Sequence, residues 1–159
     1  MSTTINSIEI NSITCKKLRT IIHKQTLEHL EEVPFGDFKL DLELCGEVYD
    51  YSEQTGHCRA YIALVDGNYA GYMVIMAAEM IHHRGVIQAV TDSFYIVKEQ
   101  RHTGLFMKLL SHIESDLKAN NIRFLSVGLN PNMPHYSKMD NMLNKIGYIT
   151  TEVSVTKEL

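Results

Sequence analysis

The chain has 159 residues, of which 45% are hydrophobic and 21% are charged, and its formal net charge is −4. This composition fits a soluble domain with a sizeable core and excludes a wholly disordered chain. Proteins that bind nucleic acid usually carry a basic stripe. Because the sequence shows none, we expect no nucleic-acid partner.

The three cysteines, Cys15, Cys45 and Cys58, are odd in number and lack CxxC spacing. They indicate neither a disulfide framework nor a zinc site, and we interpret them as reduced thiols in a reducing compartment. The N-terminus lacks a basic patch followed by an apolar run, and no apolar stretch approaches membrane-spanning length. We therefore expect a cytoplasmic protein without a membrane partner.

The hydrophobic pattern predicts ten elements. Alternating apolar and polar residues indicate strands, and apolar residues three and four apart indicate helices. Turn residues separate them, as in Asp66-Gly67-Asn68 of a predicted hairpin. In chain order we predict a strand at 5–10, a helix up to Glu32, a helix at about 40–49 that ends before Gly56, strands at 57–65, 69–78 and 86–97, a helix from Leu105 to about Leu117 stopped by Asn120-Asn121, a strand at 124–129, a helix at 136–146 and a strand at 148–156.

This order, β-α-α-β-β-β-α-β-α-β, predicts one mixed α/β (α+β) domain over residues 1–159, with a single sheet. Three successive strands without intervening helices speak against a doubly wound nucleotide-binding fold.

The most informative segment is the polar loop between the strand at 86–97 and the helix that begins at Leu105. The first turn of a helix has N–H groups without intrahelical partners, and the helix dipole makes that end positive. A loop from Arg101 to Phe106 would point several N–H groups at one spot, which suits a pyrophosphate. Gly104 would let the backbone approach the phosphates closely. A plain strand-to-helix turn fits these residues equally well.

The segment Arg101-His102-Thr103-Gly104-Leu105-Phe106 resembles the Arg/Gln-x-x-Gly-x-Gly/Ala signature of the GNAT superfamily of N-acetyltransferases. It departs from that signature at Phe106, where the family has Gly or Ala, and at His102, often Gly. These departures would narrow the phosphate pocket or shift the cofactor.

Further motifs extend the resemblance over nearly the whole chain. Lys145-Ile146-Gly147-Tyr148 resembles the family's Lys-Leu-Gly-Phe, and Asp66-Gly67-Asn68-Tyr69-Ala70-Gly71-Tyr72 resembles its Asp-Gly-x-x-x-Gly-Tyr hairpin. Ile81-His82-His83-Arg84, Asp92 and the ending Lys157-Glu158-Leu159 look most like a subgroup common in bacteriophage genomes.

The resemblance implies a mostly antiparallel sheet flanked by helices, and acetyl-CoA as the acetyl donor. The fourth and fifth strands would splay apart to hold pantetheine, which backbone groups of the fifth strand, at Phe94 and Ile96, would bind. A backbone N–H near Phe94 or Tyr95 would polarise the acetyl carbonyl. Pyrophosphate would lie on the backbone amides of Arg101, His102, Thr103, Gly104, Leu105 and Phe106.

The implied reaction, direct attack of an amine on the thioester, needs a base for the ammonium proton. Glu79, expected at the end of the fourth strand and facing the acceptor cleft, is one candidate; an ordinary solvated Glu fits as well. Asp92 lies in an otherwise apolar strand and needs a partner. It would bind the acceptor's cation or take protons, or it would be satisfied by a neighbouring Arg or His such as Arg84.

The acid that protonates the leaving thiolate is less well marked. Many family members use a Tyr four residues before the Gly of the Gly-Phe/Tyr pair, and here that position is Leu143. Tyr136 or His135 would replace it, or the thiolate would leave unassisted. His82 and His83 could titrate near neutral pH, although a polar loop is their simplest home. The histidine spacing indicates no metal site.

Two functions are therefore carried forward. The first is an acetyl-CoA-dependent N-acetyltransferase with an amine acceptor, small molecule or protein, that the sequence does not identify. The second is a binding or regulatory protein on the same fold that lacks catalysis, such as a phage protein that docks on a host target. Dimers are usual among proteins of this kind, so a homodimer is a further expectation.

Overall fold

The computed structural model describes residues 7–33 and 44–159. These residues divide into two compact units: those within Met1–Ile22 and Leu44–Gly128, and those within His23–Glu43 and Leu129–Leu159. One domain over residues 1–159 stays a prediction. The elements are β1 (Ile8–Ile13), α1 (Cys15–Glu32), α2 (Gly46–Gln54), β2 (Cys58–Val65), β3 (Asn68–Glu79), β4 (Ile87–Ile96), the 3₁₀ helix η1 (Lys98–Gln100), α3 (Leu105–Ala119), β5 (Phe124–Ser126) and α4 (Tyr136–Lys145).

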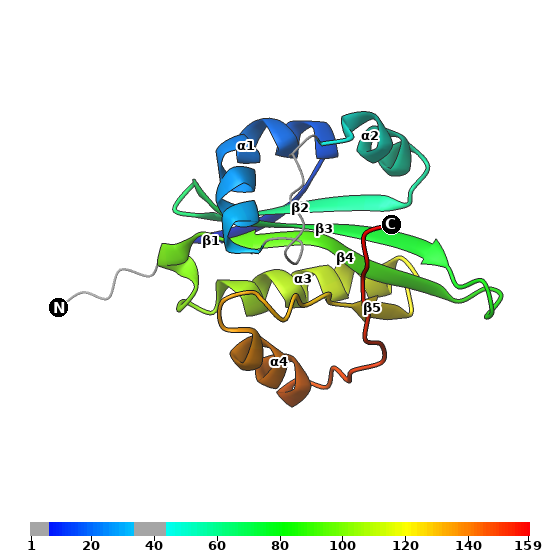
Figure 1. The fold of residues 1–159 in the computed structure, drawn as a ribbon. Helices are drawn as coiled ribbons and strands as arrows, with labels where there is room; N and C mark the ends of the chain where they lie inside the picture. Colours follow the sequence, from blue (N-terminus) through cyan, green and yellow to red (C-terminus); the bar gives the residue numbers. More distant parts are fainter. Residues whose placement is uncertain (1–6, 34–43) are drawn as a thin grey trace. The chain divides into compact units, whose positions relative to one another are not determined.

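The first unit is built on a five-stranded sheet in the order β1-β2-β3-β4-β5. The first four strands pair antiparallel, and β5 pairs with β4 in parallel. Parallel neighbours need a crossover connection, which α3 provides. Within this unit, α3 covers one face of the sheet, and α2 with the beginning of α1 covers the other (Figure 1). The predicted mixed, mostly antiparallel α/β fold is confirmed.

Side chains of the central strands point alternately into two apolar layers. On β2, Ala60 and Ile62 lie in a buried cluster with Leu18 of α1. Tyr61, between them, points the other way and donates a hydrogen bond to Asp116 of α3. Because both faces of the sheet are covered, β3 is apolar over most of its length.

The β2–β3 hairpin and its approach to β4 depend on two glycines. Asp66 and Gly67 both have positive φ, 51° and 76°, as the two-residue turns that suit hairpin twist require. Gly71 lies opposite Ile96 of β4. A Cβ at Gly71 would lie 2.7 Å from the Tyr95 carbonyl oxygen, so only glycine lets the two strands meet here.

Two helices end as the sequence predicts. Asn121 after α3 and Gly147 after α4 both adopt positive φ, 60° and 102°. In each case the N–H of the next residue reaches back to a carbonyl in the last helical turn, a Schellman cap that satisfies otherwise unpaired groups. These bonds are Ile122 N–H to Leu117 O and Tyr148 N–H to Leu143 O, both 3.0 Å.

The predicted closing strand at 148–156 is wrong, because residues 149–159 have no regular secondary structure. Val153 and Val155, whose alternation indicated the strand, are exposed to 83% and 93%. Alternation alone cannot make a strand, since a strand also needs a neighbour for its backbone hydrogen bonds.

Other boundaries also shift, and the strand predicted at 124–129 ends at Ser126. The first strand extends to Ile13 rather than ending at Ile10. The second helix spans Gly46–Gln54 instead of about 40–49, and Leu40 and Leu42 lie outside the described residues. Its place is stabilised by a contact that spacing does not reveal, the 2.9 Å ion pair between Arg19 of α1 and Asp50 of α2. The strand numbers are also corrected: Glu79 ends β3, and Phe94 and Ile96 lie on β4, each one strand earlier than expected.

Candidate functional site

β4 and β5 diverge about halfway along β4. They pair at only three positions, the last of which joins Val90 to Ser126. Just beyond, the Thr91 hydroxyl accepts a hydrogen bond of 2.8 Å from the Gly128 N–H and fixes the point of divergence. From Asp92 to Ile96, β4 therefore has a backbone edge that β5 does not cover.

Phe94 and Ile96 direct their backbone groups to this open edge. The Val97 N–H bonds the Ala70 carbonyl, 3.0 Å, on the β3 side. Because successive residues of a strand direct their backbone groups to opposite edges, Tyr95 also faces β3, whereas Phe94 and Ile96 face away from it. Of the two amides expected near the acetyl group, the one on the open edge is that of Phe94.

The loop after β4 ends in a helix N-terminus rich in available donors. Gly104 is the N-cap of α3 with φ 77°, and the first helical bond is Lys108 N–H to Gly104 O. The Arg101 and Thr103 amides bond carbonyls inside the loop. No other described group bonds the remaining four of the six predicted amides, those of His102, Gly104, Leu105 and Phe106.

Arg101 ties the loop to the strand. Its Nε donates to the Ile96 carbonyl at 2.9 Å, and its guanidinium lies 5.3 Å from the centre of the Tyr95 ring. Arg101 thus brings a permanent positive charge to the loop, and its side chain hydrogen-bonds one of the carbonyls on the open edge of β4.

Phe106 does not block the loop. Its side chain is 9% exposed and packs on Phe94 with ring centroids 5.5 Å apart. It belongs to the buried face of α3, together with Leu109 and Leu110. A ring that is turned into the core leaves the amides around Gly104 unobstructed.

Asp92 is held beside the point of divergence by a β-bulge. The β3–β4 register passes from Ser93 to Thr91, so Asp92 has no partner residue on β3. Simple alternation would place Asp92 on the α3 side with Phe94, but the bulge turns it toward α2. There the Tyr49 hydroxyl donates to its Oδ2 at 2.7 Å, and the Ser93 hydroxyl to the same oxygen at 3.2 Å.

Tyr49, rather than Arg84 or a histidine, is thus the partner of Asp92. Burial and the neighbouring carboxylate raise the pKa of Tyr49 well above its usual range, so its phenol remains a donor. The Asp92 side chain is exposed, and no described residue bonds its Oδ1. Sequence reasoning missed Tyr49 because it treated this residue only as part of the helix predicted at about 40–49; the signal available was that Asp92, in an apolar strand, needs a partner.

Glu79 and Asp92 do not come together. Glu79 pairs with Ile87 at the beginning of β4, five residues before Asp92. At about 3.3 Å per residue, the two backbones lie about 16 Å apart along the strand. The Glu79 carboxylate accepts a hydrogen bond from the Gly85 N–H in the β3–β4 loop. A shallow hollow beside it is lined by His57, Met76, Ala77, Ala78, Met80, Gln88 and Val90.

The proposed acid residues lie in the second unit. Tyr136 is the half-buried first residue of α4, and His135, with φ 63°, is its N-cap. Leu143, at the position where many family members carry the acid, is 5% exposed. His82 and His83 lie in the β3–β4 loop as expected. Over residues 7–33 and 44–159, no three His, Cys, Asp or Glu side chains gather as metal ligands would, and no helix has the length and hydropathy to cross a membrane.

Solved structures share this fold. A ribosomal-protein-alanine N-acetyltransferase from Brucella melitensis biovar Abortus 2308 aligns over 96% of this chain and 99% of its own, with a TM-score of 0.71 and 14% identity. An aminoglycoside acetyltransferase from an uncultured soil metagenomic sample gives the same coverage, a TM-score of 0.74 and 12% identity. A predicted acetyltransferase with acetyl-CoA, from Clostridium acetobutylicum, aligns over 96% of both chains at 0.69 and 11% identity.

No family model and no curated protein sequence matches the chain. The likeness is therefore one of structure, and it extends over nearly the full length of each protein compared. The chain has the GNAT fold, that of the N-acetyltransferases expected from the Arg101–Phe106 motif.

Proposed function

We propose that this chain is an acetyl-CoA-dependent N-acetyltransferase that transfers an acetyl group to an amine. One observation carries the proposal: the open edge of β4 leads within ten residues to a helix N-terminus with amides that no other described residue bonds. An extended amide-containing chain suits the first, and a pyrophosphate suits the second. The similar structure that contains acetyl-CoA supports this choice.

The residues present fit coenzyme A. The Phe94 C=O and the Ile96 N–H, both on the open edge of β4, would bond the pantetheine amides as an added strand would. The four available amides, from His102 to Phe106, would bind the pyrophosphate, with the Arg101 charge nearby. Gly104 has no heavy atom within 4 Å of where its Cβ would lie, which leaves room for the phosphates.

The chemistry would take place beside Asp92. The Asp92 carboxylate would take a proton from the acceptor ammonium, and the neutral nitrogen would attack the thioester carbonyl. The new C–N bond would replace the C–S bond while the Phe94 N–H stabilised the charge on the carbonyl oxygen, and the second proton of the amine nitrogen would pass to the departing thiolate. With a thiol pKa of about 8.5, the leaving thiolate needs little help, and Tyr136 as its acid stays a prediction.

Asp92 is a better candidate base than Glu79. Asp92 lies where the edge of β4 is no longer covered by β5. The Tyr49 and Ser93 hydroxyls bind its Oδ2, so Oδ1 would be the oxygen that takes the acceptor's proton. Glu79, at the end of β3, lies about 16 Å from Asp92 in the direction of the strands. Its carboxylate already accepts a hydrogen bond from the Gly85 amide.

The second candidate function is a binding protein that has lost catalysis. The buried Leu143 favours it, because an apolar side chain there cannot supply the proton that many family members deliver from this position.

Calorimetric titration with acetyl-CoA tests the phosphate site. We expect Gly104→Asp to weaken acetyl-CoA binding roughly 100-fold, because it places a carboxylate against the phosphates. Gly67→Asp is the matched control: its φ is 76° and its Cβ would also meet nothing within 4 Å, but it lies in the hairpin turn. Equal binding by the two variants would show that the phosphates lie elsewhere.

Release of the CoA thiol then separates the two functions. The acceptor panel includes an aminoglycoside and a peptide with an N-terminal alanine, the acceptor classes that two similar structures name. Thiol release with any amine supports the enzyme. Tight binding of acetyl-CoA without thiol release supports the binding protein, and absence of acetyl-CoA binding contradicts the enzyme and the proposed cofactor.

A further inference from the structure

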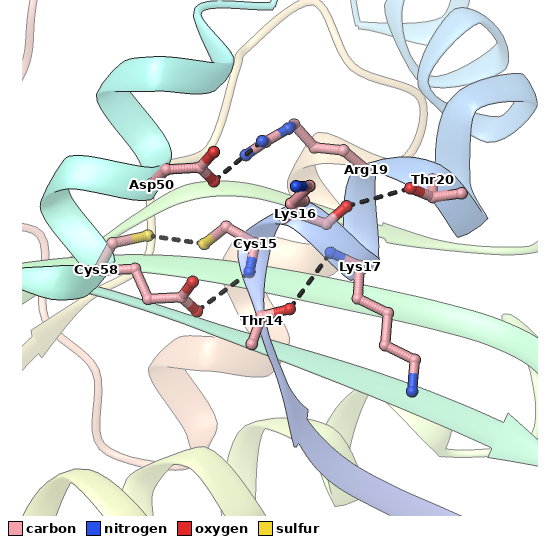
Figure 2. Close-up of polar contacts among 9 residues, drawn as sticks. Thr14, Cys15, Lys16, Lys17, Arg19, Thr20, Asp50 and Cys58 are labelled. Atoms are coloured by element: carbon pink, nitrogen blue, oxygen red, sulfur yellow. Dashed lines mark hydrogen bonds and ion pairs between the residues drawn. The ribbon is translucent and has the colours of Figure 1, made fainter.

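Two buried thiols touch beneath α1 and α2. The sulfur atoms of Cys15 and Cys58 are 3.4 Å apart, and the residues are only 2% and 4% exposed (Figure 2). A disulfide has sulfur atoms about 2.05 Å apart, so closing the bond needs a shift of little more than 1 Å. The third cysteine, Cys45, is exposed.

The sheet register brings the two cysteines together. β1 and β2 pair up to Ile13 and Ala60. Two residues beyond this last pair, Cys15 begins α1 and Cys58 begins β2, so the end of the β1–β2 pairing leaves the two side chains next to each other. Their sulfur atoms are already in contact at 3.4 Å, so a small local movement suffices to close the bond. The Cys15 N–H also donates to the Glu53 carboxylate of α2 at 3.0 Å, which holds this end of α1 in place.

We infer that Cys15 and Cys58 form a reversible, peroxide-sensitive dithiol. One thiolate attacks hydrogen peroxide: an S–O bond forms, the O–O bond breaks and water is lost, which leaves a sulfenic acid. The second thiol attacks that sulfur, and a second water leaves as the S–S bond forms. In total, two thiols are oxidised, one peroxide is reduced to two waters, and an external thiol reverses the change.

Because both thiols are buried, their oxidation is slow, and only a small oxidant such as hydrogen peroxide can reach them. Burial raises the pKa of both thiols. The hydrogen bond between them lowers the pKa of Cys15 and raises that of Cys58, and Asp92 and Glu53 raise that of Cys58 further. Glu53, Asp50 and Arg19 face Cys15 and act in opposing directions, the first two raising its pKa and Arg19 lowering it. The thiolate fraction is therefore small near neutrality, and oxidation is slow at pH 7 and faster at higher pH.

The bond would join the beginning of α1 to β2 and enclose the 42 residues between the two cysteines, including α2. Such a loop restricts the unfolded chain, so the oxidised protein is more resistant to heat. The inference does not depend on the proposed function, because it rests on the contact between Cys15 and Cys58 and not on the candidate cofactor site.

The test uses the full chain with Cys45→Ser, which removes the exposed thiol and leaves the pair intact. The protein is treated with hydrogen peroxide at pH 7 and pH 9, unfolded in N-ethylmaleimide and mapped by mass spectrometry without reduction. We expect a peptide pair joined through Cys15 and Cys58, two hydrogens lighter than the free peptides, formed faster at pH 9 and lost with dithiothreitol. Two labelled thiols, or higher oxides without a link, would overturn the inference.

Thermal unfolding gives a second measurement. Oxidised Cys45→Ser should melt roughly 10 °C above its reduced form, given the size of the loop. Cys58→Ala in the same background provides the control, since its remaining thiol has no partner and peroxide should not raise its Tm. An equal rise in both proteins would mean that peroxide acts at another site.

Discussion

Asp116 anchors α3, the helix whose N-terminus forms the candidate phosphate site. Its Oδ2 accepts hydrogen bonds from the Tyr61 hydroxyl at 2.6 Å and from the Arg59 guanidinium at 3.0 Å. Tyr61 is 1% exposed, whereas the Arg59 and Asp116 side chains are about one-third exposed. The two contacts should therefore differ in energy.

Asp116→Ala should destabilise the fold by about 2 kcal/mol. The buried Tyr61 hydroxyl loses its only partner among the described residues, which costs roughly 1–3 kcal/mol. The half-exposed ion pair to Arg59 adds about 0–1 kcal/mol, because water screens it. Alanine is a better helix former than aspartate by about 0.6 kcal/mol, and this gain offsets part of the loss.

A double-mutant cycle isolates the buried bond. In a Tyr61→Phe background no hydroxyl is left without a partner, so Asp116→Ala should cost about 1–2 kcal/mol less than in the parent chain. The helix-propensity gain and the loss of the Arg59 ion pair are the same in both backgrounds and cancel.

Urea unfolding followed by circular dichroism measures all four proteins. The slope of free energy against urea must agree among them for the comparison to hold. If Asp116→Ala costs the same in both backgrounds, within about 0.3 kcal/mol, the buried hydroxyl does not depend on Asp116, and the anchoring role assigned to this carboxylate is wrong.

Three further predictions concern pH, packing and the base. Burial raises the pKa of Tyr72 to about 12, above the value of about 10 in an unfolded chain, so its contribution to stability is full below pH 10 and is lost toward pH 12; Tyr72→Phe should flatten this part of a urea-midpoint profile. Gly71→Ala should cost about 1–3 kcal/mol in urea unfolding, because its Cβ would lie 2.5 Å from a side-chain atom of β4, whereas Gly128→Ala, whose Cβ would lie 3.6 Å from its nearest neighbour, the Thr91 hydroxyl oxygen, should stay within about 0.5 kcal/mol. Tyr49→Phe removes a hydrogen bond of roughly 1.5 kcal/mol from the Asp92 carboxylate, so kcat/KM should fall about tenfold while calorimetry shows unchanged acetyl-CoA affinity; an unaltered kcat/KM would remove Tyr49 from the site.

Much of the candidate cofactor site was predictable because its signals are local. The polar loop, Gly104 and the apolar face of α3 lie within about twenty consecutive residues, and a helix N-terminus offers free amides wherever it occurs. The sequence also raised Phe106 as an obstacle, and only packing removed it, since the ring lies against Phe94 in the core. The sequence also could not tell which loop amides are already hydrogen-bonded. The backbone conformation of the folded loop pairs the Arg101 and Thr103 amides with carbonyls of the same loop.

The sequence by itself determined the elements whose causes lie within a few residues: the Asp66-Gly67 turn, the Asn121 and Gly147 helix ends, and the strand-loop-helix order around Gly104. Tertiary structure alone decided that Tyr49 holds Asp92, that Cys15 meets Cys58, and that residues 149–159 form no strand. The physical reason is the separation along the chain of the residues that interact. Turns and caps depend on hydrogen bonds between near neighbours, whereas a bulge, a cross-strand contact or a missing strand partner depends on residues brought together from far along the chain.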